Sequence, residues 1–267
     1  MKRKKIITAG RYRREVIYTP PTKWDTPQAQ REKRGHSSEA RKRMNDKTAK
    51  GKLKMILAAN FAPQDYLVTL TYRDEALPAR RQTAQRDVKK YIATLRAVRK
   101  ARGEVLRYIY TIEHKHGEGR YHVHMVLNQS RGNDFEEIRS LWTHGEVIEI
   151  QPLTEWASPG NPGYTAIAEY LAKESGDRPL GSRMWTGSTN LAKPKEESYW
   201  VADSETIAPP KGSTIIEREE KVTEYGSYSY CEYVLPEGTA RRKPARNPAA
   251  VPISTPRSQA TGRRQGS

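Results

Sequence analysis

The segment YHVHMVL, which begins at Tyr121, restricts the fold more than any other part of this sequence. Side chains alternate between the two faces of a β-strand, so every second residue would share one face. On one face these residues are Val123, Met125 and Leu127. That apolar face needs a core to pack against, which predicts a strand covered on one side. His122 and His124 would project together from the opposite face, roughly 6–7 Å apart along the strand.

The pattern of apolar residues around this strand predicts an α+β fold. From residue 66 the expected elements follow the order strand, helix, strand, strand, helix, strand, helix. They span residues 66–72, 83–102, 104–114, 120–128, 134–145, 146–153 and 163–175. The first six match the ferredoxin-like arrangement, in which helices pack on one face of an antiparallel sheet. Two later segments, STIIERE and YSYCEYVLP, could also form strands.

The formal net charge of +17 is concentrated at the two ends of the 267-residue chain. Residues 1–60 contain 18 Lys and Arg against 5 Asp and Glu, and residues 237–267 contain 7 against 1. Basic arms on a nearly neutral body favour a polyanionic partner such as DNA, because Lys and Arg contacts to phosphates release counterions. The alternative interpretation is that these ends are solvated tails without a partner.

Composition divides the chain into three expected parts. Residues 1–36 mix basic residues with Pro, Gly and Gln and would form a basic flexible arm. Residues 237–267 would form a basic disordered tail. Residues 37–236 would form the folded domain, which begins with a basic helix between about Ser38 and Asn60.

Several protein classes are disfavoured by the sequence. Cys231 is the single cysteine, which excludes a disulfide framework and a zinc site built from cysteines. No apolar run approaches the roughly 18 residues that a membrane span requires. The basic N-terminus lacks the apolar segment of a signal peptide. We therefore expect a soluble intracellular protein.

The paired imidazoles are typical of metal ligands, and a third ligand should come from a neighbouring strand. Glu113 lies near the end of the preceding strand, so pairing across the loop would bring it close to His122 and His124. Two histidines and one carboxylate would leave other coordination positions open for water or substrate. His114 and His116 lie nearby and are rival ligands.

The segment AEYLAKE, residues 168–174, adds a possible nucleophile. Tyr170 and Lys173 stand three residues apart on an expected helix and would be neighbours on its surface. A tyrosine hydroxyl can act as a covalent nucleophile, and a lysine beside it can balance charge on a phosphate. Tyr164 lies about 120° away around the helix, so it is an outside candidate for a second nucleophile.

Together these segments resemble the three motifs of the HUH endonuclease superfamily. The motifs are YLVTLTY at residues 66–72, Glu113 with HVH at residues 122–124, and YLAK at residues 170–173. The sequence is most similar to the replication initiators of rolling-circle phages and plasmids, over about residues 50–193. It departs from them in the extra His114 and His116 and in its terminal extensions.

The resemblance implies an HUH endonuclease fold and a metal-assisted transesterification. His122, His124 and Glu113 would hold Mg²⁺ or Mn²⁺, which polarises the scissile phosphate. Tyr170 would attack single-stranded DNA at a replication origin, leaving a 5′-phosphotyrosine link and a free 3′-hydroxyl. Lys173 would orient or neutralise the phosphate. Such a protein would act in the cytoplasm of a bacterial host cell, with host replication proteins as further partners.

Three other functions remain open. A relaxase or a single-strand transposase of the same superfamily would use the same residues. A DNA-binding regulator would keep the fold and the basic arms, but gives no reason for the five site residues to occur together. A zinc-dependent hydrolase would leave Tyr170 without a role. Site chemistry favours the nicking initiator over these alternatives.

Overall fold

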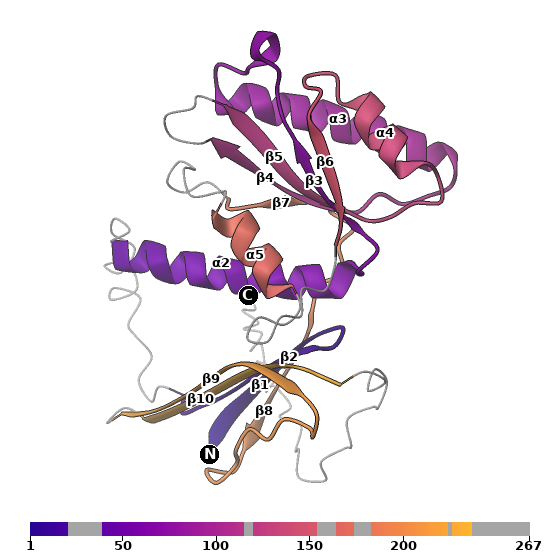
Figure 1. Cartoon of the computed structure of the whole chain (residues 1–267). Helices are drawn as coiled ribbons and strands as arrows, with labels where there is room; N and C mark the ends of the chain where they lie inside the picture. Colours follow the sequence, from indigo (N-terminus) through magenta and orange to yellow (C-terminus); the bar gives the residue numbers. More distant parts are fainter. Residues whose placement is uncertain (21–38, 115–119, 154–163, 174–182, 224–225, 237–267) are drawn as a thin grey trace, which may run out of the picture.

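The computed structural model contains two five-stranded antiparallel sheets and four α-helices in the part of the chain that it describes (Figure 1). The described residues are 1–20, 39–114, 120–153, 164–173, 183–223 and 226–236. The predicted α+β class is therefore confirmed. None of the described helices is long and apolar enough to cross a membrane.

The first sheet, here called the histidine sheet, has the strand order β6-β3-β5-β4-β7. Its strands are β3 (Tyr66–Leu70), β4 (Tyr108–His114), β5 (Tyr121–Leu127), β6 (Ile148–Pro152) and the short β7 (Thr186–Gly187). The helices connected to it are η1 (Asp74–Ala76), α3 (Arg81–Ala101), α4 (Asp134–Leu141) and α5 (Thr165–Lys173). Apart from the single turn η1, the element order predicted from residue 66 onward is confirmed.

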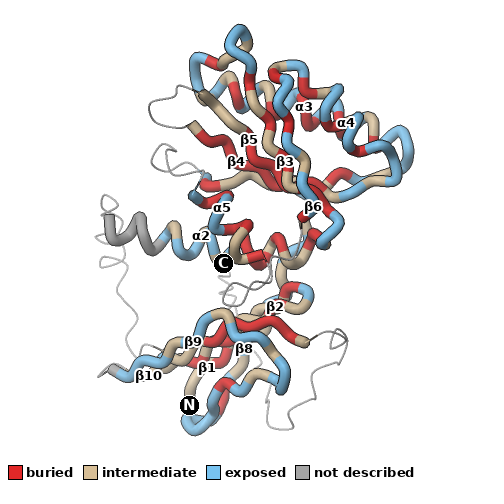
Figure 2. Tube along the Cα trace, viewed as in Figure 1, coloured by how far each residue is buried: buried red, intermediate tan, exposed pale blue. Residues whose placement is uncertain are grey.

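The two faces of the histidine sheet have separate apolar cores. Val123, Met125 and Leu127 of β5 pack with α3 and α4 on one face, as their alternation predicted. On the other face, Ile109 and Val126 contact apolar residues of α2 (Glu39–Asn60) and of α5. The structure thus adds two helices on the face opposite to α3 and α4. Figure 2 shows buried residues on both the strands and these helices.

Helix α2 joins the histidine sheet to a second sheet. Its buried residues Leu53 and Leu57 belong to the same core cluster as Val126 of the histidine sheet and as Tyr12 and Val234 of the second sheet. Because one apolar cluster includes residues of both sheets, burial of α2 stabilises their association. The predicted helix from Ser38 to Asn60 is therefore present, and its apolar C-terminal half lies between the sheets.

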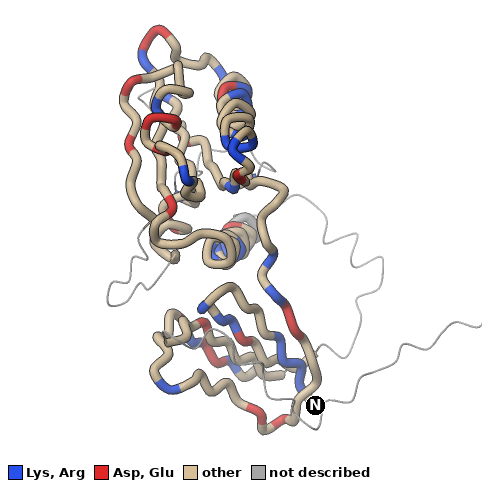
Figure 3. The backbone as a smooth tube through the Cα atoms, turned by 90° about the vertical axis from the view of Figure 1, so that its right-hand side faces the viewer, with Lys and Arg blue, Asp and Glu red and all other residues tan. Residues whose placement is uncertain are grey.

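The second sheet, here called the terminal sheet, has the order β8-β1-β2-β10-β9 and draws strands from near both ends of the chain. The strands are β1 (Lys2–Ala9), β2 (Tyr12–Tyr18), β8 (Lys195–Val201), β9 (Thr214–Thr223) and β10 (Gly226–Val234). Strands β9 and β10 include the two late segments that the sequence suggested. Figure 3 shows Lys and Arg along this sheet beside Asp and Glu.

The prediction of a flexible arm over residues 1–36 is wrong for residues 2–18. These residues form the hairpin β1–β2, in which Ala9 pairs with Tyr12 across a two-residue loop. Gly10 in that loop has a φ of 56°, a conformation that glycine adopts without steric cost. The strands hold because β1 pairs with β8 and β2 pairs with β10. Residues 21–38 and the predicted tail 237–267 lie outside the described residues.

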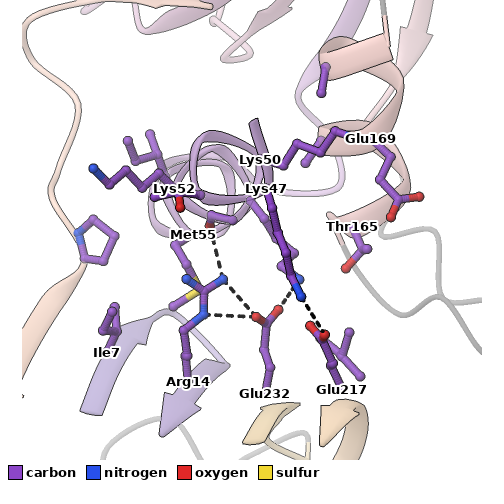
Figure 4. A pocket seen from close by; sticks show the side chains of 18 of the residues that line it. Ile7, Arg14, Lys47, Lys50, Lys52, Met55, Thr165, Glu169, Glu217 and Glu232 are labelled. Atoms are coloured by element: carbon purple, nitrogen blue, oxygen red, sulfur yellow. Dashed lines mark hydrogen bonds and ion pairs between the residues drawn. The ribbon is translucent and has the colours of Figure 1, made fainter. Parts of the chain in front are cut away.

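Buried ion pairs hold the terminal sheet to α2 (Figure 4). The side chain of Glu232 on β10 has no exposed area, and it pairs with Arg14 Nη2 at 2.8 Å and with Lys54 of α2. Burial opposes ionisation of this carboxyl, but Lys54 and Arg14 outweigh it and hold the pKa of Glu232 below its ordinary value. Part of the basic charge of residues 1–60 therefore neutralises carboxylates inside the protein.

Candidate active site

The pairing of β4 with β5 brings the predicted carboxylate and both histidines together. Glu113 is the direct cross-strand partner of His122. Glu113 Oε2 lies 2.9 Å from His124 Nε2 and 3.6 Å from His122 Nδ1. The two imidazole rings have centroids 6.5 Å apart and stand nearly perpendicular, at 89°. Both histidines thus face the same carboxylate from one side of the sheet.

Helix α5 places Tyr170 against this group. The Tyr170 hydroxyl lies 3.0 Å from His124 Nδ1, and its ring centroid lies 5.1 Å from that of His124. Ile167, Ala168 and Leu171 of α5 are buried, which fixes the helix against the core, while Tyr170 keeps 38% of its surface exposed. The tyrosine therefore touches the histidine pair and remains accessible to a substrate.

Thr69 is a member of this group that the sequence did not single out. Its hydroxyl lies 3.2 Å from His124 Nδ1, because Thr69 on β3 is the cross-strand partner of His124. The signal was present in the alternation of YLVTLTY, which directs Leu67 and Thr69 to the same face. A register between β3 and β5 was needed to recognise it.

The donor set suits a divalent cation, although it is not arranged around one. In an octahedral shell with bonds of about 2.0–2.1 Å, adjacent donor atoms lie about 3 Å apart. The separations of Glu113 Oε2 from the two imidazoles, 2.9 and 3.6 Å, are of that size. Within the described part of the chain, however, no three His, Cys, Asp or Glu side chains already surround a common metal position. Binding would therefore exchange the Glu113–His124 contact for contacts to the ion.

Burial differs among the three donors. His124 is 3% exposed and Glu113 is 7% exposed, whereas the side chain of His122 is 21% exposed. A buried carboxylate and imidazole must satisfy each other with hydrogen bonds, because an unpartnered buried polar group costs about 1–3 kcal/mol. Glu113 and His124 thus form the interior of the site, and His122 forms its solvent side.

Tyr164 is held in the core away from this group. It is 2% exposed, and its hydroxyl donates a hydrogen bond of 2.6 Å to the backbone oxygen of Phe61. Its backbone amide donates to the hydroxyl of Tyr12 on β2 at 2.5 Å. These contacts give Tyr164 a packing role between α5, α2 and the terminal sheet.

Lys173 lies on a different side of α5 from Tyr170. Lys173 lines a cavity of about 1410 Å³ between α2, α5 and the terminal sheet. Tyr170 instead lines a cavity of about 200 Å³ beside β3 and β6, which Thr69, Glu149 and Gln151 also line. The structure therefore brings Tyr170 to the histidines but directs Lys173 towards the larger cavity.

The rival histidines are not part of the group. His114 follows Glu113 on β4 and so points to the opposite face, where its ring packs 4.3 Å from that of Tyr121. His116 lies outside the described residues. Among the described residues, the histidines that contact Glu113 are His122 and His124.

The comparison with known families concerns the part of the chain that carries this group. Residues 65–175 match a family model for replication-associated proteins of the ORF2 type. The match supports a role in DNA replication. It covers less than half of the chain, from the start of β3 to the end of α5, and it leaves out the terminal sheet and most of α2. No curated protein and no solved structure matches the chain.

The matched segment contains all five residues of the group. They are Thr69, Glu113, His122, His124 and Tyr170. A replication-associated family implies DNA as a binding partner. It does not assign a reaction to these side chains.

Proposed function

We propose that this protein is a replication initiator that nicks single-stranded DNA at an origin, with Tyr170 as the nucleophile. The observation that carries the proposal is the 3.0 Å contact between the Tyr170 hydroxyl and His124 Nδ1. This contact joins a tyrosine on α5 to the two histidines and the glutamate on β4 and β5. The family match at residues 65–175 supports the replication context.

Glu113 and His124 prepare the tyrosine for attack. When His124 Nε2–H donates to the Glu113 carboxylate, Nδ1 carries the lone pair and can accept the Tyr170 proton. Thr69 contacts the same nitrogen and limits rotation of the ring. The arrangement follows the general pattern in which a nucleophile contacts a base and a third group orients that base.

The reaction exchanges one phosphodiester for another. Tyr170 Oη forms a bond to phosphorus, and the bond from phosphorus to the 3′-oxygen breaks. The 3′-oxygen gains a proton and becomes a free hydroxyl, while the 5′-phosphate stays on the tyrosine. Because the number of phosphodiester bonds is unchanged, the free 3′-hydroxyl can reverse the step and reseal a strand.

A divalent cation, Mg²⁺ or Mn²⁺, is part of the proposal. Glu113, His122 and His124 would hold it, and when bound it would supply Lewis-acid polarisation of the scissile phosphate. Imidazole ligands bind in the deprotonated form, so His124 Nε2 would release its hydrogen bond to Glu113. His122, the most exposed of the three, can meet an ion that enters from solvent.

Lys173 contributes charge at a distance from the nucleophile. It lines the larger cavity rather than the small cavity beside Tyr170. We therefore assign it to the phosphate backbone of the strand beyond the nick, and not to the leaving group. This role differs from that of a partner that activates the tyrosine directly.

The test compares two tyrosine variants with the wild type. The protein is incubated with Mn²⁺ and labelled single-stranded oligonucleotides tiled across the DNA element that encodes it, and covalent adducts are resolved on a denaturing gel. Tyr170→Phe removes one oxygen and should abolish the adduct. Tyr164→Phe, the matched control on the same helix, should retain it.

Two results would contradict the proposal. An adduct that persists in Tyr170→Phe and disappears in Tyr164→Phe would transfer the nucleophile to Tyr164. No adduct with the wild type on any tiled oligonucleotide, despite retained DNA binding, would favour a DNA-binding regulator without cleavage. Mass spectrometry of the digested adduct should assign the phosphate to the peptide that contains Tyr170.

A further inference from the structure

One face of the terminal sheet carries an unusual row of side chains near the N-terminus of β1. In register across the five strands, the directly paired residues are Trp200, Arg3, Tyr18, Tyr228 and Lys221. Directly paired residues of neighbouring strands point to the same face. Strands lie about 4.8 Å apart, so the row is about 19 Å long. It contains three aromatic rings and two cations.

This row is not used to form a core. The opposite face of the sheet has its own apolar cluster, which includes Ile17, Cys231 and Tyr233. On the row's own face, packing against α2 involves Ala9, Tyr12 and Val234 at the other end of the strands. Trp200 and Tyr228 remain 39% and 37% exposed. Large exposed aromatic side chains in such an arrangement indicate a binding surface.

The contacts within the row hold its members in position for a ligand. The Arg3 guanidinium lies 5.2 Å from the centroid of the Trp200 ring and donates to Ser198 Oγ at 2.9 Å. The rings of Tyr228 and Tyr230 are nearly parallel, at 8°, with centroids 6.5 Å apart. Within the described part of the chain, Arg3 makes no ion pair with a carboxylate, so its charge is available to a phosphate. Lys221 pairs with Glu219 at the surface, where such pairs are weak.

The same face leads towards the candidate active site. Tyr228 and Tyr230 line the cavity of about 1410 Å³, and so does Lys173 of α5. Lysines of α2 line it from the other side, as Figure 4 shows for Lys50 and Lys52. In the described part of the chain, neither Lys50 nor Lys52 forms a salt bridge. A strand lying on the row could therefore continue along basic side chains to the helix that carries Tyr170.

We propose that the terminal sheet is a stacking platform for single-stranded DNA, with bases on Trp200, Tyr18 and Tyr228 and phosphates at Arg3 and Lys221. Unpaired bases expose flat faces that stack on aromatic rings, and the phosphates between them require cations. Duplex DNA buries those faces within its own base stack and would not use the row. The proposal rests on the proposed function for the identity of the strand, which would be the DNA that flanks the nick.

The test measures equilibrium binding of the full-length protein by fluorescence anisotropy. The probes are a labelled 30-nucleotide oligo(dT) and a labelled duplex of equal length. Stacking of one base on an aromatic side chain contributes about 1–3 kcal/mol by alanine substitution, so Tyr228→Ala and Trp200→Ala should each weaken oligo(dT) binding roughly 5- to 150-fold. Tyr228→Phe and Trp200→Phe keep a ring and should restore most of the affinity. Binding of the duplex should change much less.

Val222→Ala is the matched control for the row. Val222 is 87% exposed, and as the neighbour of Lys221 on β9 it points to the opposite face. It should bind oligo(dT) like the wild type. Wild-type affinity in both Tyr228→Ala and Trp200→Ala would overturn the proposal, as would equal weakening in Val222→Ala or equal weakening of duplex binding. Thermal unfolding of each variant identifies any loss of affinity that comes from misfolding.

The adduct assay separates this proposal from the proposed function. Tyr170→Phe should bind oligo(dT) normally, because the row does not depend on the nucleophile. If the wild type forms no adduct but the row variants lose affinity for single strands, the platform stands and the nicking function fails. If the wild type forms an adduct and the row variants keep full affinity, the nicking function stands and the platform fails.

Discussion

The histidine sheet and the terminal sheet have equal numbers of strands and the same antiparallel pairing, yet they arise differently from the sequence. The histidine sheet uses strands between residues 66 and 187, each with apolar residues directed to a core. The terminal sheet combines residues 2–18 with residues 195–234, and its strands are rich in Lys, Arg and Glu. A high density of charge at a chain end therefore does not by itself indicate a flexible arm.

The two sheets also differ in what their polar side chains do. In the histidine sheet, Glu113 and His124 are buried next to an accessible tyrosine, which is the arrangement of a reactive site. In the terminal sheet, Glu232 is buried between Arg14 and Lys54, which is the arrangement of a structural ion pair. Similar residue types are thus used for chemistry in one sheet and for cohesion in the other. The following substitutions test this difference.

The largest effect is expected at His122, where activity and stability should separate. His122→Ala should reduce adduct formation by roughly 100-fold or more, because even residues that only support metal ligands typically contribute 10- to 100-fold. The free energy of unfolding should change by less than about 1 kcal/mol, since the side chain is part-exposed. Adduct yield and thermal unfolding measure the two effects.

His144→Ala is the control for this substitution. His144 is also part-exposed, but its ring packs 5.0 Å from that of Trp142, away from Glu113. It should retain adduct formation. Equal losses in the two variants would mean that the histidine sheet responds to any histidine substitution, and the assignment of the site would fail.

A loss of stability is expected at Glu232, in the terminal sheet. Glu232→Gln leaves Arg14 and Lys54 without their buried countercharge and should lower the free energy of unfolding by about 3–5 kcal/mol. Glu196→Gln removes a partner from the exposed pair with Lys5 and should cost less than about 1 kcal/mol. Chemical denaturation of both variants gives the comparison. Similar values for the two would show that burial of the ion pair does not matter.

The same carboxyl predicts a dependence of stability on pH. Because the folded protein lowers the pKa of Glu232 below its ordinary value of 4.5, its contribution is fully present above about pH 4.5. The contribution is lost as the pH falls through the lowered pKa. The difference in unfolding free energy between wild type and Glu232→Gln should therefore shrink below pH 4.5. A difference that stays constant down to pH 3 would contradict the ion-pair explanation.

The smallest effect concerns the contact between the two sheets. The Tyr12 hydroxyl of β2 accepts a hydrogen bond from the backbone amide of Tyr164 on α5. Tyr12→Phe should lower the free energy of unfolding by about 1 kcal/mol, the usual net value of such a bond. The shared apolar cluster should keep unfolding a single cooperative transition. Two separate calorimetric transitions in the wild type would show that the sheets unfold independently.

The sequence was sufficient for the elements of the histidine sheet because its signals are local. Period-two alternation in β5 and helical spacing of Val88, Ile92 and Leu95 in α3 each depend on neighbours within one element. The cross-strand proximity of Glu113 and His122 also followed from a short connection. Pairing partners close in sequence need little loop-closure entropy, so local pattern and final structure agree.

The terminal sheet shows where local reasoning stopped. The hairpin β1–β2 did have a signal, in β-branched residues flanking Gly10, but the basic composition was taken to indicate flexibility. The pairing of β2 with β10 joins residues more than 200 positions apart, and no local pattern specifies such a partner. Only the register of the folded sheet aligns Arg14 with Glu232, and Arg3 with Tyr18 and Trp200.

The candidate active site divides in the same way. The sequence by itself determined the residue types and the faces: two histidines and a glutamate on adjacent strands, followed by a tyrosine on a helix. The tertiary structure alone decided that α5 packs on the histidine side, that Tyr170 rather than Tyr164 meets His124, and that Lys173 faces the other cavity. Periodicity fixes the direction of a side chain relative to its own element, whereas long-range packing of apolar faces decides which elements meet.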